Sequence, residues 1–356
     1  MTVARQASLQ TVAEMAGTSM STVSRVLSGK GPVRQTLARR VLQAVHQSGY
    51  VPNRAASALA RGPSVPAGFV YGRVGLADVR SQGEDKHGSS FLGRAERAGC
   101  DVLERAGIDL MLCRLCPSDL EGSRVHQWLA RARVDGVLAH FPRGLDPTPL
   151  ARAVPTVVYG VRSTGGCAFV EADNEIGVWE LVRHLAGLGH RRLLFVGTEL
   201  TTARPHAYFV ARRDAFVAAV AAAADSGVQG QVAEVDRSAM AAYARALGRQ
   251  PADERPTALV ACCDQDAVHL LYGLHAAGVR VPQEISIVGF DGKEAGEQCV
   301  PALTTWAVDW EELGAASAEQ LIAAVRGQRS TRRVLIGGRL VVRGTSAPPR
   351  ALIAPT

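Results

Sequence analysis

Residues 11–27, TVAEMAGTSMSTVSRVL, carry one apolar pattern twice, once on each side of a glycine. Both halves follow the i, i+3, i+4 spacing of a helix with a single buried face. The apolar positions are Val12, Ala13 and Ala16, then Val23, Val26 and Leu27. Gly17 can adopt the left-handed conformation that ends a helix, and the Ser19 hydroxyl can accept a hydrogen bond from the next helix's first turn. The stretch therefore predicts two short helices joined by a tight turn.

A third helix is predicted after this pair, because apolar residues keep the helical spacing as far as Gly49. Three helices with a tight turn between the first two are typical of a helix-turn-helix DNA-binding unit, whose second helix enters the major groove. A generic three-helix bundle is the alternative. In the DNA-binding interpretation, Arg25 can form two hydrogen bonds to a guanine edge. The other outward residues of the second helix are Met20, Ser21, Thr22 and Ser24.

The net charge of +7 is confined to the N-terminal region. Residues 1–62 contain eight basic side chains and one acidic side chain, whereas the remainder contains 32 of each. A charge excess often marks only a solvated surface. An excess limited to one small helical unit favours a polyanionic partner such as DNA.

A short helix and a linker are predicted where this basic region ends, in GYVPNRAASALARG (residues 49–62). Pro52 keeps the third helix from continuing, because the residue before a proline avoids the α region. Asn53 can cap a helix over residues 54–60, and residues 62–66 are typical of a linker. So few residues do not form a stable isolated helix in water, so we expect this helix to need a partner.

These segments resemble the lactose/galactose repressor family of bacterial transcription regulators. VAEMAGTSMSTVSRVL (12–27) is similar to the family's headpiece pattern V-A-x-x-A-G-V-S-x-x-T-V-S-R-V-[LI]-N. YVPNRAASALARG (50–62) is similar to its hinge pattern Y-x-P-N-x-x-A-x-x-L. The departures are Thr18 in place of valine, Ser28 in place of asparagine, and Arg34 in place of the serine that usually caps the third helix.

The resemblance implies two kinds of DNA contact. Met20, Ser21 and Arg25 take positions that contact bases or phosphates. The paired hinge helices of a dimer enter the minor groove, where Leu59 would wedge open a central base step with Ala56 beside it. The candidate DNA contacts, with Arg34 included because it can reach a phosphate, are Thr11, Ser19, Met20, Ser21, Thr22, Ser24, Arg25, Arg34, Asn53, Arg54, Ala56 and Leu59.

Beyond the linker, short apolar runs alternate with amphipathic helical stretches, which predicts parallel sheets covered on both faces. The clearest helix covers residues 176–188 and is followed by Gly189. Turns near residues 165 and 291 suggest two such sheets, each a Rossmann-like lobe with ligands at the carboxyl ends of its strands. The predicted strands are Val74–Ala77, Leu110–Arg114, Gly136–Phe141, Thr156–Tyr159, Leu193–Val196, Ala258–Ala261 and Ser286–Gly289.

The expected fold is an all-α helix-turn-helix headpiece followed by an α/β core of two Rossmann-like lobes. The resemblance implies that this core is of the type I periplasmic-binding-protein-like kind. We expect the DNA-binding domain in residues 1–52, the hinge helix and linker in 53–66, the effector-binding core in 67–346 and a tail in 347–356.

Three core segments resemble the same family's effector-binding core. They are EADNEIGVWELVRHLAGLGHRRLLFVG (171–197), RRDAF (212–216) and the segment 256–292, which ends in VGFDG. By position in these motifs, Asp291 would accept hydroxyl hydrogens of an effector and Arg212 would supply a rigid donor fork. The remaining candidates for the effector pocket are Asp173, Cys263 and Trp306.

Each of these candidates has a simpler structural alternative. Asp173 or Asp291 could cap a helix, Arg212 could be a surface charge, and Trp306 could be a core residue instead of closing the pocket. Cys263 stands where the family commonly has a ligand-binding asparagine, so the sugar contacts expected there differ.

Other functional classes have little support in the sequence. No H-E-x-x-H, P-loop or G-x-S-x-G motif occurs, and we expect neither catalytic residues nor a cofactor or metal. Cys113-x-x-Cys116 could be a redox or metal pair, but it has no second matching pair. An exported solute-binding protein would need a signal peptide and would not carry the basic helical unit.

We therefore expect a cytoplasmic, nucleoid-associated homodimer that binds a pseudo-palindromic operator in double-stranded DNA. Its expected effector is a small molecule, a sugar or sugar derivative between the lobes, and its expected role is repression. No apolar run approaches the roughly 18 residues that span a bilayer, so we expect no membrane partner. Seven cysteines over this length favour reduced thiols.

Overall fold

The computed structural model describes residues 8–28, 33–48, 73–78, 90–114, 134–140, 146–160, 167–201, 205–328 and 333–350. The chain divides into two compact units, Met1–Gly68 and Phe69–Thr356. The expected hinge helix and linker (53–66) and the last residues of the expected tail (351–356) lie outside the described residues.

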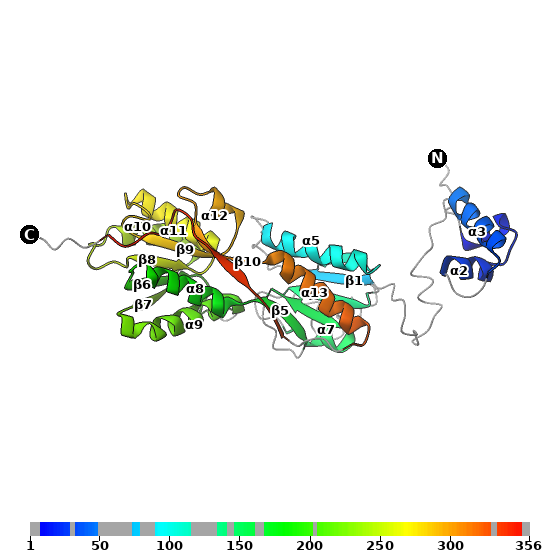
Figure 1. Cartoon of the computed structure of the whole chain (residues 1–356), viewed down its shortest axis with the longest axis horizontal. Helices are drawn as coiled ribbons and strands as arrows, with labels where there is room; N and C mark the ends of the chain where they lie inside the picture. Colours follow the sequence, from blue (N-terminus) through cyan, green and yellow to red (C-terminus); the bar gives the residue numbers. More distant parts are fainter. Residues whose placement is uncertain are drawn as a thin grey trace, which may run out of the picture. The chain divides into compact units, whose positions relative to one another are not determined.

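The N-terminal unit contains α1 (Leu9–Met15), α2 (Met20–Ser28) and α3 (Gln35–Ser48) (Figure 1). Between α1 and α2, Gly17 has a φ of +58°, and the amide of Thr22 donates a hydrogen bond to Ser19 Oγ at 3.2 Å. The predicted helices, left-handed glycine and capping serine are therefore confirmed. The buried core consists of Val12, Ala13, Ala16, Val23, Val41 and Ala44.

One long side chain joins α3 to the end of α1. Arg40 Nη2 donates a hydrogen bond to the carbonyl of Ala16 at 2.5 Å. A Cβ at Gly17 would lie 2.7 Å from that nitrogen, so this position needs glycine for space as well as for its positive φ. A cation here also interacts favourably with the helix dipole of α1.

In the described part of the C-terminal unit, two sheets of six strands each run almost entirely parallel (Figure 1). The first sheet contains β1 (Arg73–Asp78), β2 (Asp109–Arg114), β3 (Gly136–His140), β4 (Thr156–Tyr159), β5 (Ala168–Ala172) and β11 (Arg333–Ile336). The second contains β6 (Arg192–Gly197), β7 (Gln229–Glu234), β8 (Ala258–Ala261), β9 (Ser286–Asp291), β10 (Thr304–Val308) and β12 (Gly338–Val341). The orders are β11-β5-β4-β3-β1-β2 and β12-β10-β9-β8-β6-β7, with β12 antiparallel to β10.

All seven predicted strands are confirmed, whereas β5, β7, β10, β11 and β12 were not predicted. The edge strand β7 is exposed along most of its length, and β11 and β12 are only partly buried. The sequence of β7, QGQVAE, has no continuous apolar run, which is the signal that identified the predicted strands, whereas the short runs of β11 and β12 and the interior strands β5 and β10 were missed.

The chain crosses between the sheets at three points. These lie at Asp173, before α8 (Asn174–Gly187), at Asp309, before α13 (Trp310–Val325), and at Gly337, between β11 and β12. The boundaries expected near residues 165 and 291 are therefore wrong. Residue 165 lies between two strands of the first sheet, and residue 291 ends a strand whose successor, β10, stays in the second sheet. A turn in the sequence does not show to which sheet the next strand returns.

Helix α8 covers the second sheet and shows why the sequence folds as predicted there. The Asp173 carboxylate caps it by accepting the amide of Ile176 at 3.0 Å, and Gly189 follows its end with a φ of +99°. Its buried face, predicted from helical spacing, includes Val178, Leu181, Val182 and Leu185.

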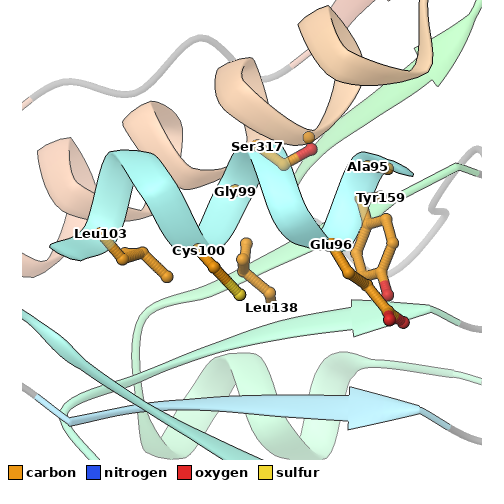
Figure 2. Close-up of a pocket in the computed structure, with 9 residues that line it drawn as sticks. Ala95, Glu96, Gly99, Cys100, Leu103, Leu138, Tyr159 and Ser317 are labelled. Atoms are coloured by element: carbon orange, nitrogen blue, oxygen red, sulfur yellow. The ribbon is translucent and has the colours of Figure 1, made fainter. Parts of the chain in front are cut away.

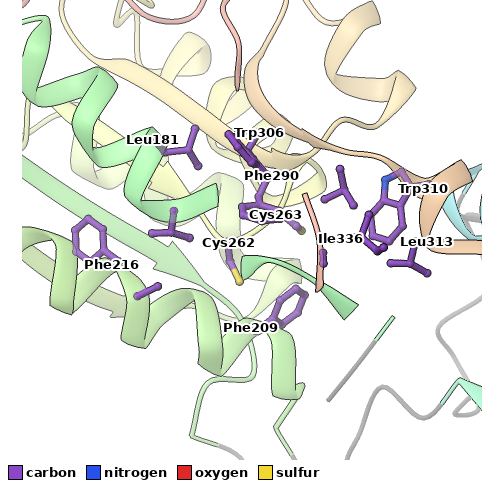
Figure 3. Close-up of a cluster of buried hydrophobic side chains, with 14 of the residues drawn as sticks. Leu181, Phe209, Phe216, Cys262, Cys263, Phe290, Trp306, Trp310, Leu313 and Ile336 are labelled. Atoms are coloured by element: carbon purple, nitrogen blue, oxygen red, sulfur yellow. The ribbon is translucent and has the colours of Figure 1, made fainter. Parts of the chain in front are cut away.

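A hydrophobic cluster extends through both sheets (Figure 3). In Figure 3, Trp306 lies beside Phe290 and Leu181, while Trp310 lies with Leu313 and Ile336. A second cluster lies around α10 (Met240–Gly248) and α11 (Asp264–Ala276). No described helix is long and apolar enough to cross a membrane.

Two helices pack very closely over the first sheet: α5 (Ser90–Arg105) and α13. A Cβ at Gly314 would lie 1.9 Å from the Ala95 carbonyl oxygen, and one at Gly99 would lie 3.1 Å from the Gly314 carbonyl oxygen. A small pocket lies beside this contact and is lined by side chains such as Cys100, Leu138 and Tyr159 (Figure 2).

Candidate functional site

The exposed face of α2 carries most of the residues predicted to read DNA. Ser21, Ser24 and Arg25 are exposed, and Met20 is 50% exposed, while Val23 on the opposite face is fully buried. Thr22 is half-buried, and its hydroxyl lies 2.9 Å from Ser19 Oγ. The helix therefore presents small polar groups and one arginine on a single face, as a helix that enters a groove requires.

The other headpiece candidates lie at helix starts. Thr11 occupies the first turn of α1, where its hydroxyl and amide both pair with Ser8, in a capping box. Arg34 is exposed at the start of α3, and its carbonyl accepts the amides of Leu37 and Ala38. Four further candidates, Asn53, Arg54, Ala56 and Leu59, lie outside the described residues.

The effector candidates converge at the carboxyl edge of the second sheet. In this sheet the order β7-β6-β8-β9-β10 reverses direction between β6 and β8, which is the switch point where doubly wound sheets bind ligands. Arg212, on α9 (Ala207–Ala222), lies there and is only 2% exposed. The alternative of a surface charge is therefore wrong for Arg212.

Each nitrogen of the Arg212 guanidinium has its own acceptor. Nε donates to Asn174 Oδ1, Nη1 donates to the carbonyl of Cys262, and Nη2 contacts Asp291 Oδ1, each at 2.8 Å. The guanidinium carbon also lies 3.7 Å from the centroid of the Phe290 ring. Burial acts to lower the pKa of Arg212, but Asp291 raises it and the net effect is upward, so the group stays charged. These contacts fix the orientation of Arg212 and join α8, α9, β8 and β9.

Asp291 is held by two cations. Its Oδ2 lies 3.1 Å from Lys293 Nζ, while Oδ1 contacts Arg212. Asp291 has a φ of +115°, which is rare for a residue other than glycine and is a form of strain found at binding sites. A carboxylate can accept about four hydrogen bonds, so both oxygens can still bind ligand hydroxyls. The helix-cap alternative does not describe Asp291, because no helix amide bonds to its side chain among the described residues.

A second carboxylate lies directly beneath this pair. Asp264 is fully buried, and it accepts the Thr305 hydroxyl at 2.5 Å and the Lys293 amide at 2.6 Å. Burial and the nearby Asp291 raise the pKa of Asp264 to about 7. Burial likewise raises the pKa of the Cys263 thiol to about 12, so that thiol is neutral at physiological pH.

Two of the five effector candidates do not line this group. Asp173 is the N-cap of α8, so its capping alternative holds, and the neighbouring Asn174 makes the contact to Arg212 instead. Trp306 is 5% exposed, and a Cβ at Gly177 of α8 would meet its ring at 2.7 Å. Trp306 therefore faces α8 within the core (Figure 3), because it lies in register with Phe290 on the neighbouring strand.

Sequence reasoning missed three residues of this site: Asn174, Arg237 and Trp310. Asn174 belongs to the D-N pair of the quoted motif, so the sequence already indicated it as a candidate site residue. Arg237, in the 3₁₀ helix η4 (Arg237–Ala239) after β7, contacts Asp266 at 2.9 Å. Trp310 donates its indole hydrogen to the Asp291 carbonyl at 2.8 Å. The last two contacts depend on strand order and had no local signal.

Less can be described of the corresponding sheet edge of the first lobe. His140 and Tyr159, at the carboxyl ends of β3 and β4, are buried, and His140 Nδ1 lies 2.9 Å from the Tyr159 carbonyl. The segments that follow these strands, 141–145 and 161–166, lie outside the described residues, as does Cys116 of the Cys113-x-x-Cys116 pair.

Two family matches cover separate parts of the chain. Residues 8–53 match bacterial regulatory proteins of the lacI family, and residues 182–346 match the periplasmic binding protein-like domain. The lactose operon repressor of Escherichia coli K12 is 27% identical over 364 residues, covering 97% of this chain and 92% of that protein. The HTH-type transcriptional regulator AglR of Rhizobium meliloti 1021 is 31% identical over 358 residues, covering 96% and 94%.

Solved structures show the same arrangement. A lac repressor dimer bound to operator and the anti-inducer ONPF superposes with a TM-score of 0.78 at 25% identity, covering 96% of this chain and 100% of that one. The complex of the transcriptional regulator CelR with cellobiose superposes with a TM-score of 0.65 at 26% identity, with the same coverage. The expected fold, a helix-turn-helix headpiece on a two-lobed periplasmic-binding-protein-like core, is confirmed. These relatives are transcriptional regulators and not enzymes.

Proposed function

This chain belongs to the lacI family of bacterial regulatory proteins and is thus a DNA-binding transcriptional regulator controlled by a small molecule, and we propose that it is a homodimeric repressor. The lactose operon repressor and the dimer bound to operator are the relatives that support repression and dimerisation. We place its action on DNA in the cytoplasm, without a catalytic step.

We propose that α2 reads the operator through Met20, Ser21 and Arg25. The separation of exposed polar groups from the buried Val23 supports this assignment. Ser19, Thr22, Ser24, Thr11 and Arg34 would position the headpiece on phosphates, which carry no sequence information themselves. In a two-fold symmetric dimer, the operator is then a pseudo-palindrome. The proposed minor-groove contacts of Asn53, Arg54, Ala56 and Leu59 rest on the hinge motif.

The effector site that we propose is the carboxyl edge of the second sheet, at Arg212, Asp291 and Cys263. The observation that carries this proposal is the buried Arg212–Asp291 pair at the switch point between β6 and β8. The CelR–cellobiose relative supports a sugar or sugar derivative as the effector. Hydroxyl groups suit this site, because carboxylate, guanidinium and ammonium groups meet there and can orient a polyol.

In our proposal, effector binding changes DNA affinity by altering how the two lobes close. Three chain crossings join the lobes, at Asp173, Asp309 and Gly337, so a ligand between them can rotate one lobe against the other without breaking either sheet. By linkage, operator DNA must change effector affinity by the same factor.

The test is selection of DNA fragments from a random pool by the purified full chain, followed by affinity measurements on the selected fragment. We expect Arg25→Ala to weaken specific binding by roughly 1–3 kcal/mol. We expect Leu59→Ser to weaken it while leaving salt-dependent binding to random DNA largely intact. Arg183→Ala is the matched control, because Arg183 is an exposed arginine of α8 in the other unit.

Two results would contradict the proposal. One is selection that enriches no fragment over the random pool. The other is an equal loss of specific and non-specific binding in Leu59→Ser, which would remove Leu59 from the wedge role.

A further inference from the structure

Arg237 occupies the same edge of the second sheet as the proposed effector site. It follows β7, and its Nε donates to Asp266 Oδ1 at 2.9 Å. Its Nη2 lies 3.9 Å from Cys263 Sγ, and its guanidinium carbon lies 6.0 Å from the Phe209 ring centroid. Arg237 therefore lies over the ends of β6 and β8, where α9 and α11 begin.

The ion pair with Asp266 uses only one nitrogen of the Arg237 guanidinium, so donors remain for another partner. A structural arginine–carboxylate pair commonly forms two parallel hydrogen bonds. Here only Nε bonds to Asp266, the sulfur contact of Nη2 is weak, and Nη1 has no hydrogen-bond partner in the described part of the chain. The Arg237 side chain is 37% exposed, whereas Asp266 is fully buried. Part of the Arg237 side chain is therefore open to solvent at the edge of the site.

Positively charged side chains are concentrated at this edge. Three cations lie there, Arg212, Arg237 and Lys293, and the carboxylates that contact them are Asp291 and Asp266. The third carboxylate of this group, Asp264, has its pKa raised to about 7 by burial and by Asp291, so it is only partly ionised near neutral pH.

Among the other nearby groups, Asp236 precedes Arg237 and is exposed, and its carboxylate accepts the amide and the hydroxyl of Ser238. Burial raises the pKa of Cys262 and Cys263, so both thiols stay neutral. Glu199 Oε2 lies 3.2 Å from His206 Nε2, so this carboxylate contacts the histidine. A ligand that brings a negative oxygen group to the remaining donors of Arg237 would form a charge-assisted hydrogen bond there.

We propose that Arg237 binds an anionic oxygen group of the effector, a carboxylate or a phosphate, at the carboxyl edge of the second sheet. This inference rests on the proposed effector site and narrows its ligand to an acidic sugar derivative. Aromatic side chains beside Arg237 would contact the ring or carbon chain, because Tyr208, Phe209 and His206 pack together with ring centroids 4.6–5.1 Å apart. Asp291 and Arg212 would then bind hydroxyl groups.

The test compares probes that share one pyranose ring and differ at C6: D-glucose, D-glucuronate and D-glucose 6-phosphate. Inorganic phosphate and acetate serve as the isolated groups. Each is titrated calorimetrically into the full chain at constant ionic strength, for the wild type, Arg237→Gln and Arg213→Gln. Arg213 is the matched control, because it neighbours Arg212 on α9 but is paired with Asp214.

We expect at least one acidic probe to bind the wild type and Arg213→Gln at least tenfold more tightly than glucose does, in keeping with a charged hydrogen bond. Arg237→Gln should abolish that preference. Glucuronate binding without glucose 6-phosphate binding would identify the group as a carboxylate, and the reverse would identify a phosphate. Because Arg237→Gln leaves Asp266 buried without its cation, the double variant Arg237→Gln, Asp266→Asn provides a second test in which that charge is removed too.

Three results would overturn the inference: equal binding of glucose and the acidic probes, an acidic preference that survives in both Arg237 variants, or no binding of any acidic probe. DNA selection by the same wild-type preparation separates this failure from failure of the proposed function. If an operator is selected but no acidic probe binds, the proposed regulatory function is supported and the proposed anionic effector is ruled out.

Discussion

The indole nitrogen of Trp310 donates a hydrogen bond to the backbone carbonyl of Asp291, 2.8 Å away. Trp310 begins α13, which packs on the first sheet, whereas Asp291 ends β9 of the second sheet. The side chain of Asp291 meanwhile contacts Arg212 and Lys293. One residue of the proposed effector site is therefore bonded directly to the other lobe, close to a chain crossing.

Trp310→Phe should weaken this connection with little change in packing volume. The Asp291 carbonyl would lose its indole donor in a buried place, which costs about 1–3 kcal/mol. We expect a lower melting temperature, measured by calorimetry, and a smaller effect of the effector on operator affinity.

Two other tryptophans provide controls for this variant. Trp179 is partly exposed on α8, and the Trp306 indole nitrogen has no hydrogen-bond partner within the described residues. Neither Trp179→Phe nor Trp306→Phe removes a bond between the lobes. A change in effector response in Trp179→Phe as large as in Trp310→Phe would contradict a specific role for Trp310.

Arg212→Met should strongly destabilise the core. The substitution removes the donors to Asn174 and Cys262 and leaves Asp291 with one cation, and breaking a buried ion pair typically costs about 3–5 kcal/mol. Urea unfolding of the full chain measures this loss. Arg213→Met is the neighbouring control and should cost less than about 1 kcal/mol, because Arg213 pairs with the exposed Asp214. Similar losses of unfolding free energy in both variants would show that the buried contacts of Arg212 do not stabilise the core.

Asp264→Asn should change how stability depends on pH. The folded protein holds the proton of Asp264 up to about pH 7, whereas the unfolded chain releases it near its ordinary pKa of 3.8. The contribution of this group to stability is therefore fully present below about pH 4 and is lost as the pH rises towards 7, by up to about 1.4 kcal/mol per pH unit. Asparagine does not titrate, so melting temperatures of the variant should decline less over this range.

Asp225→Asn is the control for that experiment, because Asp225 is exposed at the end of α9. It should leave the pH profile of the wild type unchanged. A profile of Asp264→Asn that is parallel to the wild type would mean that Asp264 remains ionised throughout.

Gly314→Ala and Gly93→Ala should have opposite effects. At Gly314 the new Cβ would lie 1.9 Å from the backbone oxygen of Ala95, so α13 must move away from α5, at a cost of at least about 2 kcal/mol. Gly93 lies on α5, and a Cβ there meets nothing within 4 Å, so alanine should stabilise the helix by about 0.5–1 kcal/mol. Thermal unfolding of the two variants compares them directly, and a Gly314→Ala protein as stable as the wild type would contradict this close contact.

The proposed homodimer has a candidate contact surface at Tyr272 and Val300. These side chains are 66% and 91% exposed, the most exposed of the large apolar side chains in the described part of the chain. They belong to the neighbouring α11 and the segment after α12 (Glu294–Gln298). Tyr272→Lys combined with Val300→Asp should shift the sedimentation coefficient from dimer to monomer. Val217→Asp, on α9, is the exposed apolar control and should leave the dimer intact.

Local sequence patterns were enough to predict the headpiece. Its helices follow one apolar period, and Gly17 and Ser19 are capping signals whose chemistry acts within a few residues. Most of the central strands were readable for a similar reason, because burial on both faces requires a continuous apolar run, but the interior strands β5 and β10 were missed. The edge strand β7 had no such signal, and the apolar runs of β11 and β12 are only three and two residues long.

The sequence by itself determined the headpiece helices and seven of the core strands, the confinement of basic charge to the headpiece, and the residue types Arg212 and Asp291 that the effector proposal uses. Only the tertiary structure decided which strands share a sheet, and it moved the chain crossings to Asp173, Asp309 and Gly337. It also placed Asn174, Arg237 and Trp310 around the site and put Trp306 in the core. The physical reason is that caps and helix faces depend on neighbours in the chain, whereas hydrogen bonds and ion pairs across a sheet edge depend on strand order, which joins residues far apart in sequence.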